Sequence, residues 1–158
     1  MIGDQEVTVQ SDQDYHVVLA GCIDIRQWAI VKAFVQQAGL VNGRLHPLSR
    51  TFGGGLVFSP IVPGAVRHHY LAALRLAVEH HGVDRVVLVS HEDCGMCQLY
   101  APESANDATY HTQLLGHSCT WLREQLPASV DLHGFLCVRK ERSIFAENLI
   151  RVYPSAVL

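Results

Sequence analysis

Residues 85–95 have the sequence RVVLVSHEDCG. The first six are mostly β-branched or aliphatic, which is typical of a buried strand of a parallel sheet. A second run of the same kind, YHVVLA at 15–20, leads into CIDIR at 22–26. In open parallel sheets, ligands bind beyond the carboxyl ends of the strands. We therefore expect the cysteines and the histidine that follow these two runs to meet at one site.

The rest of the chain alternates strand-like and helix-like segments. Further strands are expected at 45–49 and 130–138, and helices at 27–37, 65–80 and 109–125. This alternation predicts one α/β domain over 1–158, with a mostly parallel sheet in strand order 2-1-3-4. Pro47 cannot donate a ladder hydrogen bond, which places the second strand near an edge. Residues 143–150 form a terminal element whose type the sequence does not fix.

Composition and charge limit the classes of protein to which the chain can belong. The chain has 158 residues, of which 49% are apolar and only 17% are charged, so a subunit interface is expected. Its formal net charge of -3 leaves no excess of basic residues of the kind that binds nucleic acid. The polar segment 1–14 does not resemble a signal peptide, and no apolar run is long enough to span a bilayer. We expect a soluble, cytoplasmic protein.

The five cysteines are an odd number, which suits a reducing compartment and metal binding or burial better than a disulfide framework. Cys119 and Cys137 fall in a predicted helix and a predicted strand, where both are expected to pack. Cys97 forms a Cys-x-x-Cys pair with Cys94, which allows a redox pair or a closed zinc site with Cys97 as fourth ligand. Redox pairs of this type normally follow the first strand of their unit, so a core position for Cys97 is favoured.

Cys22, His91 and Cys94 together offer two thiolates and one imidazole. This donor set suits zinc and leaves its fourth position open for water, as in catalytic rather than structural sites. Asp24 can accept a hydrogen bond from that water or ligate the ion itself. Arg26 can hold the carboxylate ionised through a bidentate pair, although a purely structural salt bridge is an alternative for these two residues.

These residues resemble the β-class carbonic anhydrases, whose motifs are Cys-x-Asp-x-Arg and His-x-x-Cys-Gly. The helix and strand at 71–90 and the strand segment at 134–136 are also similar to that family, so the resemblance covers roughly residues 15–147. It implies a lyase with one zinc ion per chain, whose zinc-bound hydroxide converts carbon dioxide to bicarbonate. It also implies a homodimer or a multiple of one, a switching role for Asp24 and Arg26, and product contacts near Gly95.

The chain departs from the family at residues 50–53. The family usually has Arg-Asn-Ala-Gly after its second strand, whereas this chain has Arg-Thr-Phe-Gly. Phe52 and Gly53 are therefore expected at the substrate pocket, with a bulkier side chain than usual. Relatives with this scaffold process carbonyl sulfide or carbon disulfide, which are the nearest alternative substrates. A zinc-binding domain without catalysis is the alternative from another class.

Three consecutive glycines, 53–55, lack the lysine and the serine or threonine that follow in a phosphate-binding loop. They are interpreted as a flexible loop of the pocket.

Overall fold

The helices and strands of the chain follow the sequence pattern closely. The computed structural model describes residues 15–22, 44–49, 54–138 and 149–154. Its helices are α2 (Gly64–His81), α3 (Gly95–Tyr100) and α4 (Ala108–Gln125), with short 3-10 helices η2 (Gly54–Phe58) and η3 (Pro102–Ser104). Its strands are β1 (Tyr15–Ala20), β2 (Arg44–Ser49), β3 (Arg85–His91), β4 (Asp131–Cys137) and β5 (Leu149–Tyr153). The helix expected at 27–37 lies outside the described residues.

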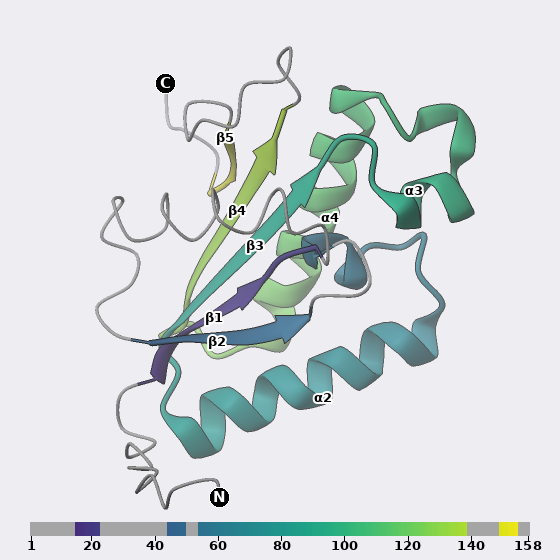
Figure 1. Ribbon diagram of the computed structural model, residues 1–158. Helices are drawn as coiled ribbons and strands as arrows, with labels where there is room; N and C mark the ends of the chain where they lie inside the picture. Colours follow the sequence, from purple (N-terminus) through teal and green to yellow (C-terminus); the bar gives the residue numbers. More distant parts are fainter. Residues whose placement is uncertain (1–14, 23–43, 50–53, 139–148, 155–158) are drawn as a thin grey trace, which may run out of the picture.

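The strands form one sheet in the order β2-β1-β3-β4-β5 (Figure 1). β1 is parallel to both β2 and β3, and β3 is parallel to β4. The α/β class with a mostly parallel sheet is therefore confirmed, and β2 lies at an edge as Pro47 predicts. The expected order lacked the fifth strand: β5 begins at Leu149 and pairs antiparallel with β4. The terminal element thus ends in an edge strand, while residues 143–148 lie outside the described part.

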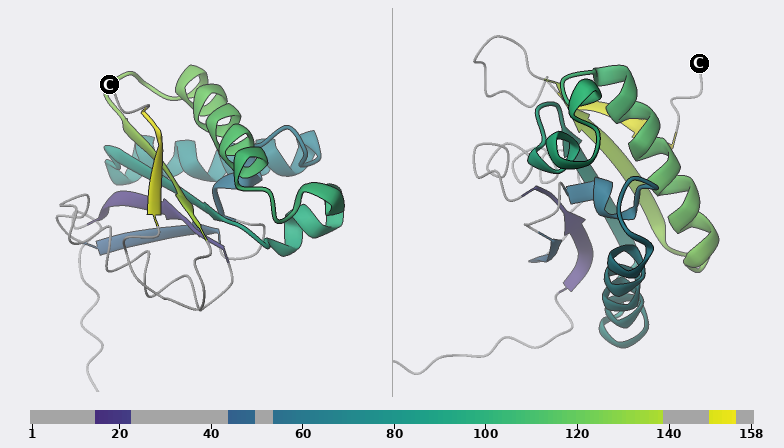
Figure 2. Two further views of the ribbon diagram at one scale, coloured as in Figure 1. Left: turned by 90° about the horizontal axis from the view of Figure 1, so that it is seen from above. Right: turned by 90° about the vertical axis from the view of Figure 1, so that its right-hand side faces the viewer.

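Helices α2 and α4 cover the same face of the sheet (Figure 2). Apolar side chains of both helices pack there against alternate residues of β1, β3 and β4. The strand residues include Val18, Val86, Leu88 and Leu132, and the helix residues include Leu71, Leu74, Leu115 and Leu122. The intervening residues of β1 and β3 are buried as well, as expected for parallel strands. No helix within the described ranges is long and apolar enough to cross a membrane.

Local signals set the ends of the two long helices. Gly82 ends α2 in the left-handed conformation, with φ of 65°, and its N–H donates to the carbonyl of Ala77. Asp107 begins α4: its Oδ1 accepts hydrogen bonds from the backbone N–H groups of Thr109 at 2.8 Å and Tyr110 at 3.3 Å. These ends fix the positions at which the chain enters β3 and α4.

The expectation of a flexible loop is wrong for Gly54 and Gly55. Both belong to η2, in which every residue is buried. A Cβ placed on Gly55 would lie 2.8 Å from Cδ1 of Leu115 and 2.9 Å from Cβ of Leu88. Glycine is needed here because η2 packs closely between α4 and β3 and leaves no room for a side chain; mobility of the loop is not the reason. Gly53 lies outside the described residues.

Candidate metal centre

Two of the expected ligand segments leave the sheet side by side. Cys22 follows β1 and His91 is the last residue of β3, and these strands pair with Ala20 opposite Leu88. The consecutive strands β2 and β3 lie on opposite sides of β1, so this is the point at which the strand order reverses. Cys94 follows in the N-cap position of α3. The sheet therefore fixes where the three side chains start.

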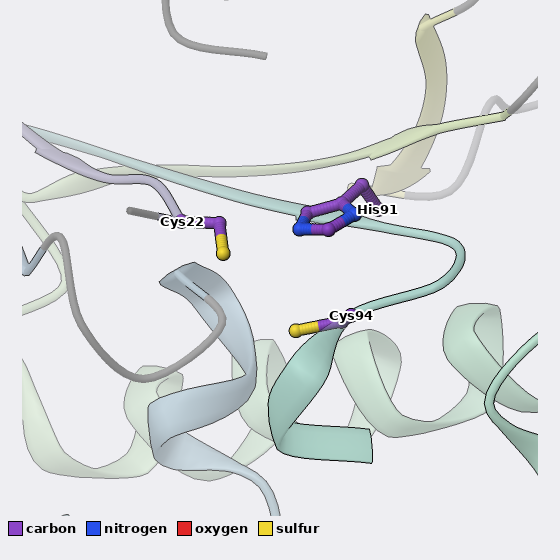
Figure 3. A group of neighbouring side chains, drawn as sticks. All are labelled: Cys22, His91 and Cys94. Atoms are coloured by element: carbon purple, nitrogen blue, oxygen red, sulfur yellow. The ribbon is translucent and has the colours of Figure 1, made fainter. Parts of the chain in front are cut away.

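The three side chains point into one space at the end of the sheet (Figure 3). The sulfurs of Cys22 and Cys94 and a ring nitrogen of His91 all lie within 4.8 Å of one another. His91 and Cys94 are buried and Cys22 is half-buried. Zinc binds sulfur at about 2.3 Å and imidazole nitrogen at about 2.0 Å, so small side-chain movements suffice for one ion to contact all three atoms. The donor set fits zinc and leaves a fourth position for water.

The ring of His91 is oriented by the backbone of the next residue. Its Nδ1 lies 2.6 Å from the carbonyl oxygen of Glu92. A carbonyl only accepts, so Nδ1 carries the proton and Nε2 keeps the lone pair that a metal ligand needs. The N–H of Glu92 donates in turn to the carbonyl of Cys137 at the end of β4, at 3.3 Å. The tautomer of the ligand is thus set by the carbonyl of Glu92, a residue that is itself hydrogen-bonded to the end of the neighbouring strand.

The charge balance around Cys94 favours a cation at this position. A hydrogen bond with the Cys22 thiol, followed by burial and by the charge of Cys22, raises the pKa of Cys94 far above its ordinary value. The backbone N–H groups of Met96 and Cys97 act in the opposite direction and lower the pKa of Cys94. Two sulfurs this close cannot both ionise without a counter-charge, and a divalent metal ion supplies one.

The turn between His91 and Cys94 depends on a left-handed residue. Asp93 has φ of 59°, a conformation that aspartate tolerates better than most residues. Its backbone N–H donates to the carbonyl of Ala105 at 3.0 Å, and its Oδ1 accepts from Nε2 of Gln98 at 3.3 Å. The chain can therefore reverse within three residues, which brings the second sulfur next to the imidazole.

Gly54 is a supporting residue that sequence reasoning missed. It has φ of 60°, and a Cβ placed on it would lie 2.2 Å from the carbonyl oxygen of Val89 and 2.8 Å from the backbone nitrogen of Cys22. The backbone of η2 thus lies directly against the ends of β1 and β3. The run of three glycines was the available signal, but a glycine run indicates close backbone approach and flexibility equally well.

The structure brings together the three predicted metal ligands. Gly95 is exposed in the first turn of α3, next to Cys94. The other predicted site residues lie outside the described part of the chain: Asp24, Arg26, Phe52 and Gly53. Their roles stay predictions.

Cys97 does not belong to the metal-binding group formed by the described residues. It is fully buried, and its sulfur lies 3.8 Å from Nδ1 of His111. Burial raises the pKa of Cys97 to about 11, so it is a thiol at neutral pH and not the thiolate of a redox pair. The expected core positions of Cys97, Cys119 and Cys137 are confirmed, and none of the five cysteines forms a disulfide.

One protein-family model matches the greater part of the chain. The family model described as "Carbonic anhydrase" matches residues 53–145, which is more than half of the sequence and includes His91 and Cys94. A comparison with curated protein sequences gave no significant match.

Several solved carbonic anhydrases have a similar fold. One from Glaciozyma antarctica has a TM-score of 0.57 and 18% identity, over 95% of this chain and 88% of that one. One from Streptococcus mutans has a TM-score of 0.55 and 16% identity, over 92% and 87%. A tetrameric β-carbonic anhydrase from Sordaria macrospora has a TM-score of 0.50 and 15% identity, over 88% and 81%. At these identities the likeness shows the fold.

Proposed function

Because the chain belongs to the β-class carbonic anhydrase family, we propose that it is a zinc lyase that hydrates carbon dioxide to bicarbonate. One observation carries the proposal: two thiols and an imidazole lie within 4.8 Å of one another at the carboxyl ends of neighbouring parallel strands. Three protein ligands leave one coordination position for the reacting water, whereas four would close the site.

The chemistry that zinc supplies when bound is a lowered pKa of water, which provides a nucleophile for the carbon of carbon dioxide near neutral pH. The chain's own residues prepare that position. Nδ1 of His91 donates a hydrogen bond to the carbonyl of Glu92, so the ring is held in place and the lone pair of Nε2 is left to bind the metal. The two sulfurs would offset the charge of the ion, so the pH of half-maximal activity is expected above that of an all-histidine site.

In this proposal Asp24 and Arg26 control the proton of the reacting water. They follow Cys22 by two and four residues, which keeps both near the metal ligand. The carboxylate of Asp24 would accept a hydrogen bond from the reacting water, and the guanidinium of Arg26 would keep that carboxylate ionised and oriented. The motif resemblance and the chemistry of the pair support these roles.

Substitution of Asp24 separates the proton step from metal binding. We expect Asp24→Asn to keep its zinc but to lose about 10²- to 10⁴-fold in kcat for hydration, the usual contribution of one acid–base group. Stopped-flow hydration of carbon dioxide with a pH indicator, together with zinc analysis of the same sample, measures both effects. Asp84→Asn is the matched control, because Asp84 is exposed and precedes β3 at the end opposite His91.

Zinc-loaded wild-type protein that fails to hydrate carbon dioxide from neutral to alkaline pH would contradict the proposed function. Carbonyl sulfide and carbon disulfide would then be assayed on the same sample, since Phe52 replaces the small residue usual at the pocket. Loss of zinc from Asp24→Asn would instead assign Asp24 to the metal ligands. Activity on none of the three substrates would favour a zinc-binding domain without catalysis.

We further propose that the chain works in the cytoplasm as a homodimer or a multiple of one. None of the five cysteines forms a disulfide, which suits a reducing compartment. Several large apolar side chains are exposed on the single chain, and a second subunit would remove them from water. They are Leu76, Leu99, Tyr100 and Ile150.

Light scattering tests the assembly directly. At micromolar concentration we expect a mass of about twice, or a higher even multiple of, the 17.5 kDa of one chain. A stable, well-folded monomer at that concentration would contradict the proposal.

A further inference from the structure

A buried histidine outside the metal-binding group connects α4 to the turn that carries Cys94. His111 lies in the first turns of α4 and is fully buried. Its Nε2 lies 2.7 Å from the carbonyl oxygen of Ala105, and its Nδ1 lies 3.8 Å from the sulfur of Cys97. Both ring nitrogens therefore have partners, one in α3 and one in the segment between α3 and α4.

The partners fix the protonation of this ring. A carbonyl oxygen only accepts, so Nε2 of His111 carries the proton and donates to Ala105. Nδ1 then holds a lone pair and accepts the S–H of Cys97. The ring thus joins one residue of α3 to one residue of the loop beyond it.

The carbonyl of Ala105 has a second donor, which leads to the metal centre. It also accepts the backbone N–H of Asp93 at 3.0 Å. Asp93 is the left-handed residue that reverses the chain between His91 and Cys94, with φ of 59°. Ala105 is fully buried and packs in one cluster with Cys94, Cys97 and Leu114. A carbonyl oriented by His111 therefore holds the strained residue on which the spacing of two ligands depends.

We infer that His111 is a positioning residue for the metal centre, acting through Ala105 and Asp93 on the placement of Cys94. This inference rests on the proposed zinc site. Hydrogen-bond partners of the metal ligands themselves commonly change metal affinity by about 10- to 100-fold when removed, and we take the same range for His111, which acts through Ala105 and Asp93. The sequence alone gives no hint of this role, because His111 is distant in the chain from both metal motifs.

The test compares His111→Leu with His111→Gln. Leucine fills the site without a donor, whereas the glutamine amide can still donate to Ala105. We expect His111→Leu to bind zinc about 10- to 100-fold more weakly in chelator competition, and His111→Gln to recover most of the affinity. In cobalt-substituted protein, the thiolate-to-metal absorption bands should change in His111→Leu and return in His111→Gln.

Leu122→Ala is the control for a loss of packing alone. Leu122 is a fully buried residue of α4 that packs in the core between the helices and the sheet, and not in the cluster with Ala105. Its truncation therefore destabilises the fold without removing a contact to Ala105. We expect zinc affinity and the cobalt spectrum of folded Leu122→Ala to match the wild type. A metal affinity equal to wild type in both His111 variants would overturn the inference.

Amide hydrogen exchange at Asp93 in metal-free protein provides a readout that needs no zinc. We expect exchange to accelerate at least about tenfold in His111→Leu and to be unchanged in Leu122→Ala, because His111, and not Leu122, contacts the acceptor of that amide. Unchanged exchange in His111→Leu would overturn the inference. Failure of the wild type to bind zinc would overturn the proposed function instead, and exchange at Asp93 would still decide whether His111 holds the turn. If His111→Leu does not fold, His111→Met, which also has no donor for the carbonyl of Ala105, replaces it in both measurements.

Discussion

The chain carrying Cys94→Ser is expected to purify without zinc. In the wild type, the sulfur of Cys94 is one of three donor atoms that the described residues bring within 4.8 Å of one another. A serine hydroxyl does not ionise to replace a thiolate, so we expect zinc affinity to fall by more than about 100-fold, beyond the loss of an outer hydrogen-bond partner. Zinc content after dialysis measures this directly. Added zinc should raise the melting temperature of the wild type but not of the variant.

Cys97→Ser is the matched control, three residues further along the chain. Its sulfur contacts His111 rather than the metal-binding group, and serine keeps a donor toward Nδ1. We expect this variant to keep its zinc, and Cys22→Ser to behave like Cys94→Ser. Full zinc in Cys94→Ser, or loss of zinc in Cys97→Ser alone, would show that the donor set is wrong.

The metal-binding group could be predicted because each ligand follows a buried strand directly. Apolar runs at 15–20 and 85–90 mark two parallel strands, and such strands end at one edge of the sheet. Strand pairing therefore brings Cys22 next to His91, and Cys94 is only three residues further along the chain, so the group can be expected without any knowledge of side-chain packing. The α/β class follows from the same alternation of segments.

The supporting residues could not be predicted, because each acts through a contact between segments far apart in the sequence. The glycine run at 53–55 does not indicate that Gly54 lies against Val89 and the backbone of Cys22. Nothing near His111 indicates that its ring reaches the acceptor of the Asp93 amide. Strand β5 was missed for another reason: its residues are all partly or fully exposed, so no alternation marks them as a strand.

Gly54→Ala is expected to damage both the fold and the metal centre. The added Cβ would meet the carbonyl oxygen of Val89 at 2.2 Å and the backbone nitrogen of Cys22 at 2.8 Å, and neither backbone atom can move without displacing a strand end. Alanine at φ of 60° costs about 1–2 kcal/mol, and overpacking adds roughly 1–3 kcal/mol. We expect the free energy of unfolding to fall by about 2–5 kcal/mol, as measured by urea denaturation.

The metal dependence of this loss distinguishes a local defect from a general one. With chelator present, Gly54→Ala should show the packing loss alone; with zinc present, it should lose additional stability relative to wild type, because the displaced backbone carries Cys22. Gly64→Ala is the control, since a Cβ at that first residue of α2 meets nothing within 4 Å. Alanine there is expected to leave zinc binding unchanged and to shift the free energy of unfolding by no more than about 1 kcal/mol, in the stabilising direction. Wild-type stability and zinc affinity in Gly54→Ala would mean that the strand ends can separate without cost, and that the contact between η2 and Cys22 does not hold the metal centre.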